Sequence, residues 1–163
     1  MKQLLIVYHT QTGGTLQMAR AAAAGAAREA GIRVRLERAV DAGPESLLES
    51  SGYLFATPEN LAAVSGMMKD FFDRTYYPVL EQLVGRPYAM LICAGSDGTN
   101  AARQIERIAT GWRLKPIADP VIVCTHAQTP EQILRPKHIA AEDLARCEEL
   151  GATLAAGLDL GIY

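Results

Sequence analysis

The sequence predicts one doubly wound α/β domain built on a five-stranded parallel sheet, with the strands in the order 2-1-3-4-5. Short apolar runs alternate along the chain with longer segments whose apolar residues recur at helical spacing. The chain has 163 residues and a hydrophobic composition of 49%, which suits a single core. We therefore expect residues 1–163 to form one domain.

The first three elements show two kinds of strand. Leu4 to Tyr8 is an unbroken apolar run, as expected of a strand that is covered on both faces. From Gly14 to Ala30, alanines recur on one side and polar residues on the other, which predicts a helix that ends at Gly31. Ile32 to Leu36 alternates apolar and charged residues, a pattern typical of an exposed edge strand. This edge pattern supports a sheet order in which the second strand lies outermost.

The middle of the chain continues the alternation. Tyr53 to Ala56 is predicted to be the third strand, and Ser65 to Tyr77 a helix that stops before Pro78. Tyr88 to Ala94 is a further buried strand. Because these strands alternate with helices, we expect right-handed crossovers and a parallel sheet.

The last third completes the pattern. A helix with Ala101 and Trp112 on its apolar side leads to the last strand, Val121 to Cys124, and the final helix spans about Ala140 to Leu158. The segment from Thr125 to His138 is longer than a usual connection. It is therefore interpreted either as a lid over a site or as a solvated crossover.

Composition excludes several classes of protein. The formal net charge is -2 and no basic stripe is present, so a nucleic-acid partner is not expected. No apolar run reaches the ~20 residues that a membrane span needs. Cys93, Cys124 and Cys147 form no CxxC pair, which favours reduced thiols in a soluble, cytoplasmic protein. No cluster of metal-ligating residues is apparent.

Three loops are expected to meet at the carboxyl edge of the sheet, where doubly wound folds bind ligands. These loops are residues 10–15, 57–65 and 95–100. The first has three hydroxyl residues and two glycines before a helix N-terminus, so hydroxyls, amides and helix dipole can face an anion. It contains no lysine. The alternative interpretation is an ordinary N-capped turn between a strand and a helix.

Two other nucleotide-binding motifs are absent after the first strand. Neither GxxxxGK[ST] nor GxGxxG with a later acidic residue is found there. The sequence therefore does not favour an ATP-type P-loop or a Rossmann dinucleotide site.

The run Thr10-Gln11-Thr12-Gly13-Gly14-Thr15 resembles the T/S-x-T-G-x-T phosphate loop of the flavodoxin-like superfamily. Residues 57–60, followed by 65–74, are similar to the second loop and helix of its NAD(P)H-dependent FMN reductase and quinone reductase branch. Residues 95–98 occupy the place of the third flavin loop. The resemblance covers nearly the whole chain.

This resemblance implies flavin mononucleotide (FMN) as the cofactor. Residues 10–15 would bind the phosphate, and the other two loops would line the isoalloxazine ring. The residues implied in cofactor binding are Thr10, Gln11, Thr12, Gly13, Gly14, Thr15, Pro58, Glu59, Asn60, Leu61, Gly95, Ser96, Asp97 and Gly98. The last four would offer backbone amides to the pyrimidine end of the ring, where donors stabilise negative charge.

The resemblance also implies an activity. NAD(P)H would be the cosubstrate and a quinone-like small molecule the electron acceptor, in an enzyme that forms a homodimer or homotetramer. Electron-carrier flavodoxins are acidic and shield the ring with aromatic residues, whereas this chain is nearly neutral and has no aromatic residue in 58–61 or 95–98. We therefore favour the reductase. A flavodoxin-type electron carrier and a flavin-binding module without turnover remain alternatives, and no catalytic residue is assigned.

Overall fold

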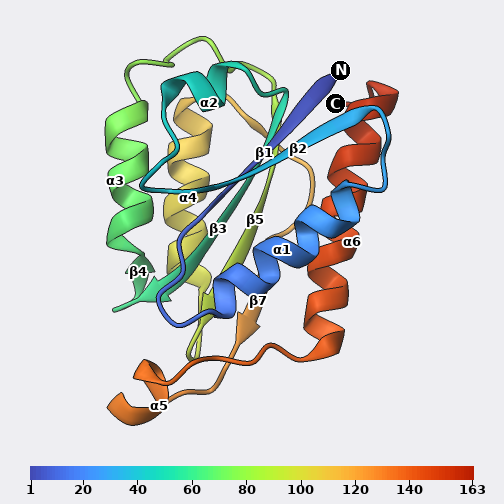
Figure 1. The fold of residues 1–163 in the computed structure, drawn as a ribbon. Helices are drawn as coiled ribbons and strands as arrows, with labels where there is room; N and C mark the ends of the chain where they lie inside the picture. The colour runs from blue at the N-terminus through green and yellow to red at the C-terminus, as the bar shows by residue number, and fades with distance from the viewer.

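The computed structural model describes residues 1–163 and confirms the doubly wound parallel sheet (Figure 1). The strands run in the order β2-β1-β3-β5, with β7 pairing beyond β5. This is the predicted order 2-1-3-4-5. The five main strands are β1 (Lys2–Tyr8), β2 (Ile32–Arg38), β3 (Gly52–Asn60), β5 (Pro87–Ala94) and β7 (Val121–Cys124).

Two short strands add to this sheet without being expected. β6 (Lys115–Pro116) pairs in parallel with the beginning of β5, and β4 (Ala63–Val64) pairs antiparallel with the end of β3. β3 therefore extends to Asn60, so residues 57–60 are strand and not loop. The sequence concealed this extension because Pro58 and the polar residues after it are more typical of a turn.

The chain has six helices, of which two were not predicted. They are α1 (Gly14–Ala26), α2 (Pro44–Leu48), α3 (Gly66–Thr75), α4 (Thr99–Gly111), α5 (Pro130–Leu134) and α6 (Ala141–Leu160). The unpredicted α2 and α5 have five residues each, too few to show a helical period. The prediction that α1 ends at Gly31 was wrong, because α1 ends at Ala26 and tight turns follow. No helix is both long and apolar enough to cross a bilayer.

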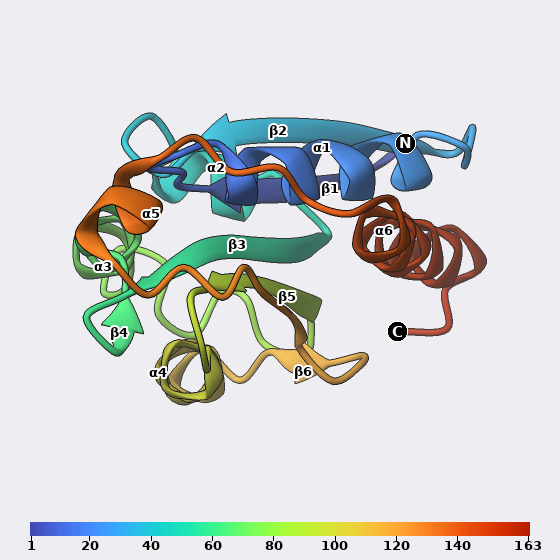
Figure 2. The same cartoon turned by 90° about the horizontal axis from the view of Figure 1, so that it is seen from below.

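The sheet separates two hydrophobic cores (Figures 1 and 2). α1 and α6 cover one face of the sheet, and α3 and α4 cover the other. Alternate residues of β1 divide between them: Leu4 and Ile6 face α1 and α6, whereas Leu5 and Val7 face the opposite core. Burial on both faces explains why β1 is an unbroken apolar run.

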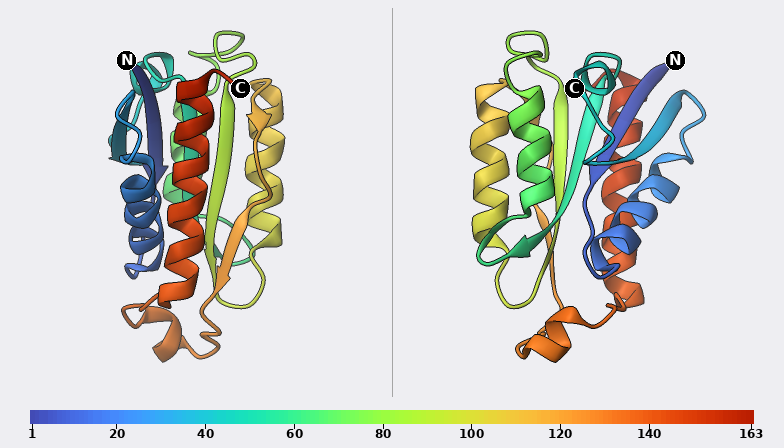
Figure 3. Two further views of the ribbon diagram at one scale, coloured as in Figure 1. Left: turned by 90° about the vertical axis from the view of Figure 1, so that its right-hand side faces the viewer. Right: turned by 60° about the vertical axis from the view of Figure 1, so that its left-hand side comes forward.

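α1 and α6 approach each other backbone to backbone (Figure 3). A Cβ atom on Gly25 would overlap the backbone of Glu148, and one on Gly151 would overlap the backbone of Ala22. Neither overlap can be relieved by turning a side chain, because the atoms in the way belong to the main chain. The two glycines therefore permit the close packing of α6 on α1.

We predict that Gly151→Ala lowers the free energy of unfolding by about 1–3 kcal/mol, because the added methyl group forces α6 away from α1. Gly66→Ala is the matched control, since a Cβ atom there meets nothing within 4 Å and Gly66 is exposed in the first turn of α3. It should leave stability unchanged or slightly higher. Urea unfolding measures both, and equal stability of Gly151→Ala and the wild type would contradict the close packing.

Candidate functional site

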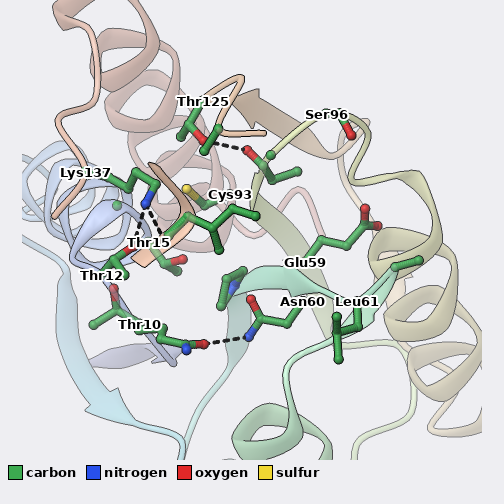
Figure 4. A pocket seen from close by; sticks show the side chains of 18 of the residues that line it. Thr10, Thr12, Thr15, Glu59, Asn60, Leu61, Cys93, Ser96, Thr125 and Lys137 are labelled. Atoms are coloured by element: carbon green, nitrogen blue, oxygen red, sulfur yellow. Dashed lines mark hydrogen bonds between the residues drawn. The ribbon is translucent and has the colours of Figure 1, made fainter. Parts of the chain in front are cut away.

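A cavity of about 560 Å³ opens at the carboxyl edge of the sheet, within the range of small-molecule sites (Figure 4). All three predicted loops contribute to it, together with the segment that carries α5. Its lining comprises Thr10, Gln11, Thr12, Gly14, Thr15, Pro58, Glu59, Asn60, Leu61, Ala62, Cys93, Ala94, Gly95, Ser96, Thr125, Ala127, Gln128, Ile133 and Lys137.

Three of the predicted site residues lie outside this lining. Gly13 and Gly98 precede α1 and α4, each with φ near 91°, a conformation that glycine adopts readily. The Asp97 carboxylate accepts hydrogen bonds from the Thr99 backbone amide (3.2 Å) and hydroxyl (2.7 Å), which lower the pKa of Asp97. These residues shape the turns, and the other predicted residues line the cavity.

The first turn of α1 presents free hydrogen-bond donors to the cavity region. No side chain caps this helix, and the amides of Gly14, Thr15 and Leu16 donate to no acceptor in the protein. The Thr10 hydroxyl accepts from the Gly13 amide at 3.0 Å and so fixes the loop. Free amides at a helix N-terminus, next to hydroxyl groups, suit an anion.

Gly14 lies where two other walls of the cavity meet the loop. A Cβ atom on Gly14 would lie 2.8 Å from the Cys93 Sγ atom and 3.3 Å from the Lys137 Cβ atom. A side chain at position 14 would therefore require the Cys93 thiol or the Lys137 side chain to move. Burial raises the pKa of the Cys93 thiol to about 11, despite the nearby ammonium group of Lys137, so Cys93 is a neutral thiol at pH 7.

Lys137 is the charged cavity residue that the sequence did not reveal. Its Nζ atom lies 3.4 Å from the Thr12 Oγ1 atom, and its backbone amide donates to the Thr12 carbonyl at 2.8 Å. The predicted phosphate loop contains no lysine of its own. Lys137, which is 125 positions beyond Thr12 in the chain, places one beside it. No local motif signals this contact, because it depends on how the α5 segment folds back.

Gln17 fastens that segment to the loop. Its Nε2 atom donates to the Gly13 carbonyl (3.0 Å) and the Lys137 carbonyl (2.8 Å), and its Oε1 atom accepts from the Ile139 amide (3.0 Å). The segment crosses the carboxyl edge of the sheet in Figure 1 and contributes five residues to the lining. Residues 125–138, expected to be a lid or a solvated crossover, therefore form a wall of the cavity.

Glu59 connects the second and third loops. Its two carboxylate oxygens accept from the Gly98 amide (2.8 Å) and the Ala101 amide (3.0 Å) and so cap α4. The carboxylate is stabilised by the positive end of that helix. The resemblance assigned the Gly98 amide to the pyrimidine end of the isoalloxazine ring, but this amide already donates to Glu59. The amides of Gly95, Ser96 and Asp97 have no protein acceptor.

Further contacts hold the β3–β4 hairpin at the cavity rim. The Asn60 Nδ2 atom donates to the Gln11 Oε1 atom at 3.1 Å, and the Asn100 Nδ2 atom donates to the Ala62 carbonyl at 2.6 Å. The turn residues Leu61 and Ala62 both have positive φ, 50° and 59°, which is uncommon for residues with a side chain. The Leu61 side chain is fully exposed at the tip. The hairpin is therefore a fixed wall with an apolar tip.

The family model described as "NADPH-dependent FMN reductase" matches residues 35–129. This match covers more than half of the chain. The chain belongs to the NADPH-dependent FMN reductase family. The match includes the Glu59 hairpin and the 95–98 loop but neither residues 10–15 nor Lys137.

Among its relatives, a "Flavodoxin" of Aquifex aeolicus is 38% identical over 97 residues, 60% of this chain and 50% of that protein. An "NAD(P)H dehydrogenase (quinone)" of Acidithiobacillus ferrooxidans is 32% identical over 95 residues, 46% of this chain and 48% of that protein. The chain spans about half the length of the curated relatives it matches.

A solved structure, "Structure of a flavodoxin from the domain Archaea", superimposes with a TM-score of 0.77 at 18% identity. The superposition covers 96% of this chain and 98% of the archaeal flavodoxin. At this identity the likeness concerns the fold alone, and it shows that the fold is flavodoxin-like.

We predict that Glu59→Ala lowers the free energy of unfolding by about 1–2 kcal/mol, because the Gly98 and Ala101 amides lose their acceptor. Glu106→Ala, which removes an exposed carboxylate from the same helix, is the control and should cost little. Chemical unfolding compares the two variants. Equal effects of the two substitutions would show that Glu59 does not cap α4.

Proposed function

We propose that the cavity binds FMN, with the phosphate at residues 10–15 and the isoalloxazine ring between residues 58–61 and 95–96. The free amides of Gly14, Thr15 and Leu16 carry the proposal for the phosphate. Family membership supports a flavin, and the cavity volume of about 560 Å³ can accommodate one. When bound, FMN supplies the ability to accept a hydride and to pass electrons on.

The ring would need little acid-base chemistry from the protein. The amides of Gly95, Ser96 and Asp97 are free to donate to its pyrimidine end, where they would stabilise added negative charge. Glu59 is the only carboxylate residue in the lining, and both of its oxygens are held by α4. The residues therefore fit a site that positions and tunes a flavin.

We further propose that the chain is an NAD(P)H-dependent oxidoreductase that passes electrons through FMN to a quinone-like acceptor. The observation that carries this proposal is that none of the residues lining the cavity is aromatic. A flavin bound there has no protein ring stacked on it, which leaves a face for a nicotinamide or a quinone. Relatives named "NAD(P)H dehydrogenase (quinone)" support the same activity.

An electron carrier is the second candidate. The Aquifex aeolicus relative named "Flavodoxin", at 38% identity, favours it. In that case a partner flavoprotein, and not NAD(P)H, would reduce the bound FMN.

A cytoplasmic location and a homodimer or homotetramer belong to the same proposal. Three free cysteines support a reducing compartment. The exposed Met67 on α3 is compatible with a contact between subunits.

The visible spectrum of the purified protein tests these functions. With added FMN we expect a shifted flavin band that bleaches when NAD(P)H is added and returns when a small quinone follows. A bound flavin that NAD(P)H leaves oxidised would favour the carrier. A spectrum identical to that of free FMN, with no change in fluorescence, would contradict FMN binding itself.

A further inference from the structure

Lys137 provides the only positively charged side chain in the cavity lining, and no carboxylate lies within 4.0 Å of it to form an ion pair. The partners of its Nζ atom are all neutral. They are the carbonyls of Gln132 (2.9 Å), Ile133 (2.8 Å) and Arg135 (2.7 Å), together with the Thr12 Oγ1 atom at 3.4 Å.

The ammonium group is held beside the loop by the main chain. The Lys137 amide donates to the Thr12 carbonyl at 2.8 Å, and the Lys137 carbonyl accepts from Gln17 at 2.8 Å. The Lys137 Cβ atom packs against Gly14, where any larger residue would be crowded. The backbone amide and the backbone carbonyl of Lys137 are thus both fixed relative to the start of α1. The residue is half-buried. A cation without a counter-ion stands next to free amides.

We propose that Lys137 is the charge partner of the phosphate monoester of the bound cofactor. This inference rests on the proposed FMN site and adds a residue to it. The loop amides and hydroxyls can bind a phosphate by hydrogen bonds, but they carry no formal charge. The Lys137 ammonium group supplies that charge from a segment outside the loop, and in doing so it links residues 132–137 to the bound phosphate. The affinity of this chain for FMN over riboflavin, which lacks the phosphate, therefore depends on Lys137.

A purely structural role for Lys137 makes a different prediction. Its bonds to the carbonyls of residues 132, 133 and 135 also stabilise the end of α5. If that were its only role, removing the ammonium group would loosen the cavity wall and weaken FMN and riboflavin binding equally. The ratio of the two affinities separates the roles, because only a phosphate contact changes it.

The experiment measures the dissociation constants of FMN and riboflavin by quenching of flavin fluorescence. The proteins are the wild type, Lys137→Met, Lys137→Gln and Lys137→Arg. Lys115→Met is the matched control, since it removes the same charge from an exposed lysine in β6, which pairs with Pro87 at the amino end of β5, away from the cavity. Far-ultraviolet circular dichroism checks that each variant is folded.

We expect Lys137→Met and Lys137→Gln to weaken FMN binding by roughly ten- to hundred-fold while riboflavin binding stays within about two-fold of the wild type. Lys137→Arg should retain most of the preference for FMN, because it keeps the charge. Lys115→Met should bind both flavins as the wild type does.

Two results would overturn the inference and leave the FMN site in place: an unchanged preference for FMN in both neutral variants, or equal losses for FMN and riboflavin. A wild type that binds neither flavin would refute the proposed function, and the role of Lys137 with it. If the neutral variants fail to fold, the salt dependence of wild-type binding decides. A preference for FMN over riboflavin that falls as salt is added supports a charge contact with the phosphate. A preference that salt leaves unchanged overturns the inference.

Discussion

The cavity depends on one tight packing contact, at Gly14. There the first turn of α1, the Cys93 side chain of β5 and the returning Lys137 meet with no room for a single extra carbon atom. Because the three come from distant parts of the chain, their contact fixes residues 10–15, the end of β5 and the α5 segment relative to one another. A side chain at this position would displace the thiol or the wall. Packing contacts within the protein thus hold these parts of the cavity together.

The N-termini of α1 and α4 differ in their hydrogen bonding. At the start of α4, Glu59 accepts from the Gly98 and Ala101 amides and Asp97 accepts from the Thr99 amide. The amides of Gly14, Thr15 and Leu16 at the start of α1 donate to no acceptor in the protein. The two helix N-termini thus have different roles, although both begin after a glycine with φ near 91°. One holds a side chain of the protein and so fixes the β3–β4 hairpin. The other retains amides without acceptors beside an ammonium group without a counter-ion, an environment that favours a negatively charged ligand.

Much of the fold could be predicted from local pattern. The apolar runs that became β1, β5 and β7, and the alternation that marked β2 as an edge, depend on which faces of a strand are buried. The end of α1 and the hairpin beyond Ala56 could not be predicted, because tertiary contacts override propensity there. The contacts of Gln17 and Lys137 at the cavity could not be predicted from the sequence either. Their contacts join residues that are 120 positions apart. Residues 10–15 could be singled out from the sequence because their hydroxyl residues and glycines occupy six consecutive positions.

The central claim is that the first turn of α1 binds the phosphate of FMN, and amide chemical shifts measure this directly. In nitrogen-15 spectra recorded during titration, the account predicts that the Gly14, Thr15 and Leu16 amides shift strongly with FMN and only slightly with riboflavin. Large FMN-dependent shifts confined to residues elsewhere, with these three amides unmoved, would contradict it.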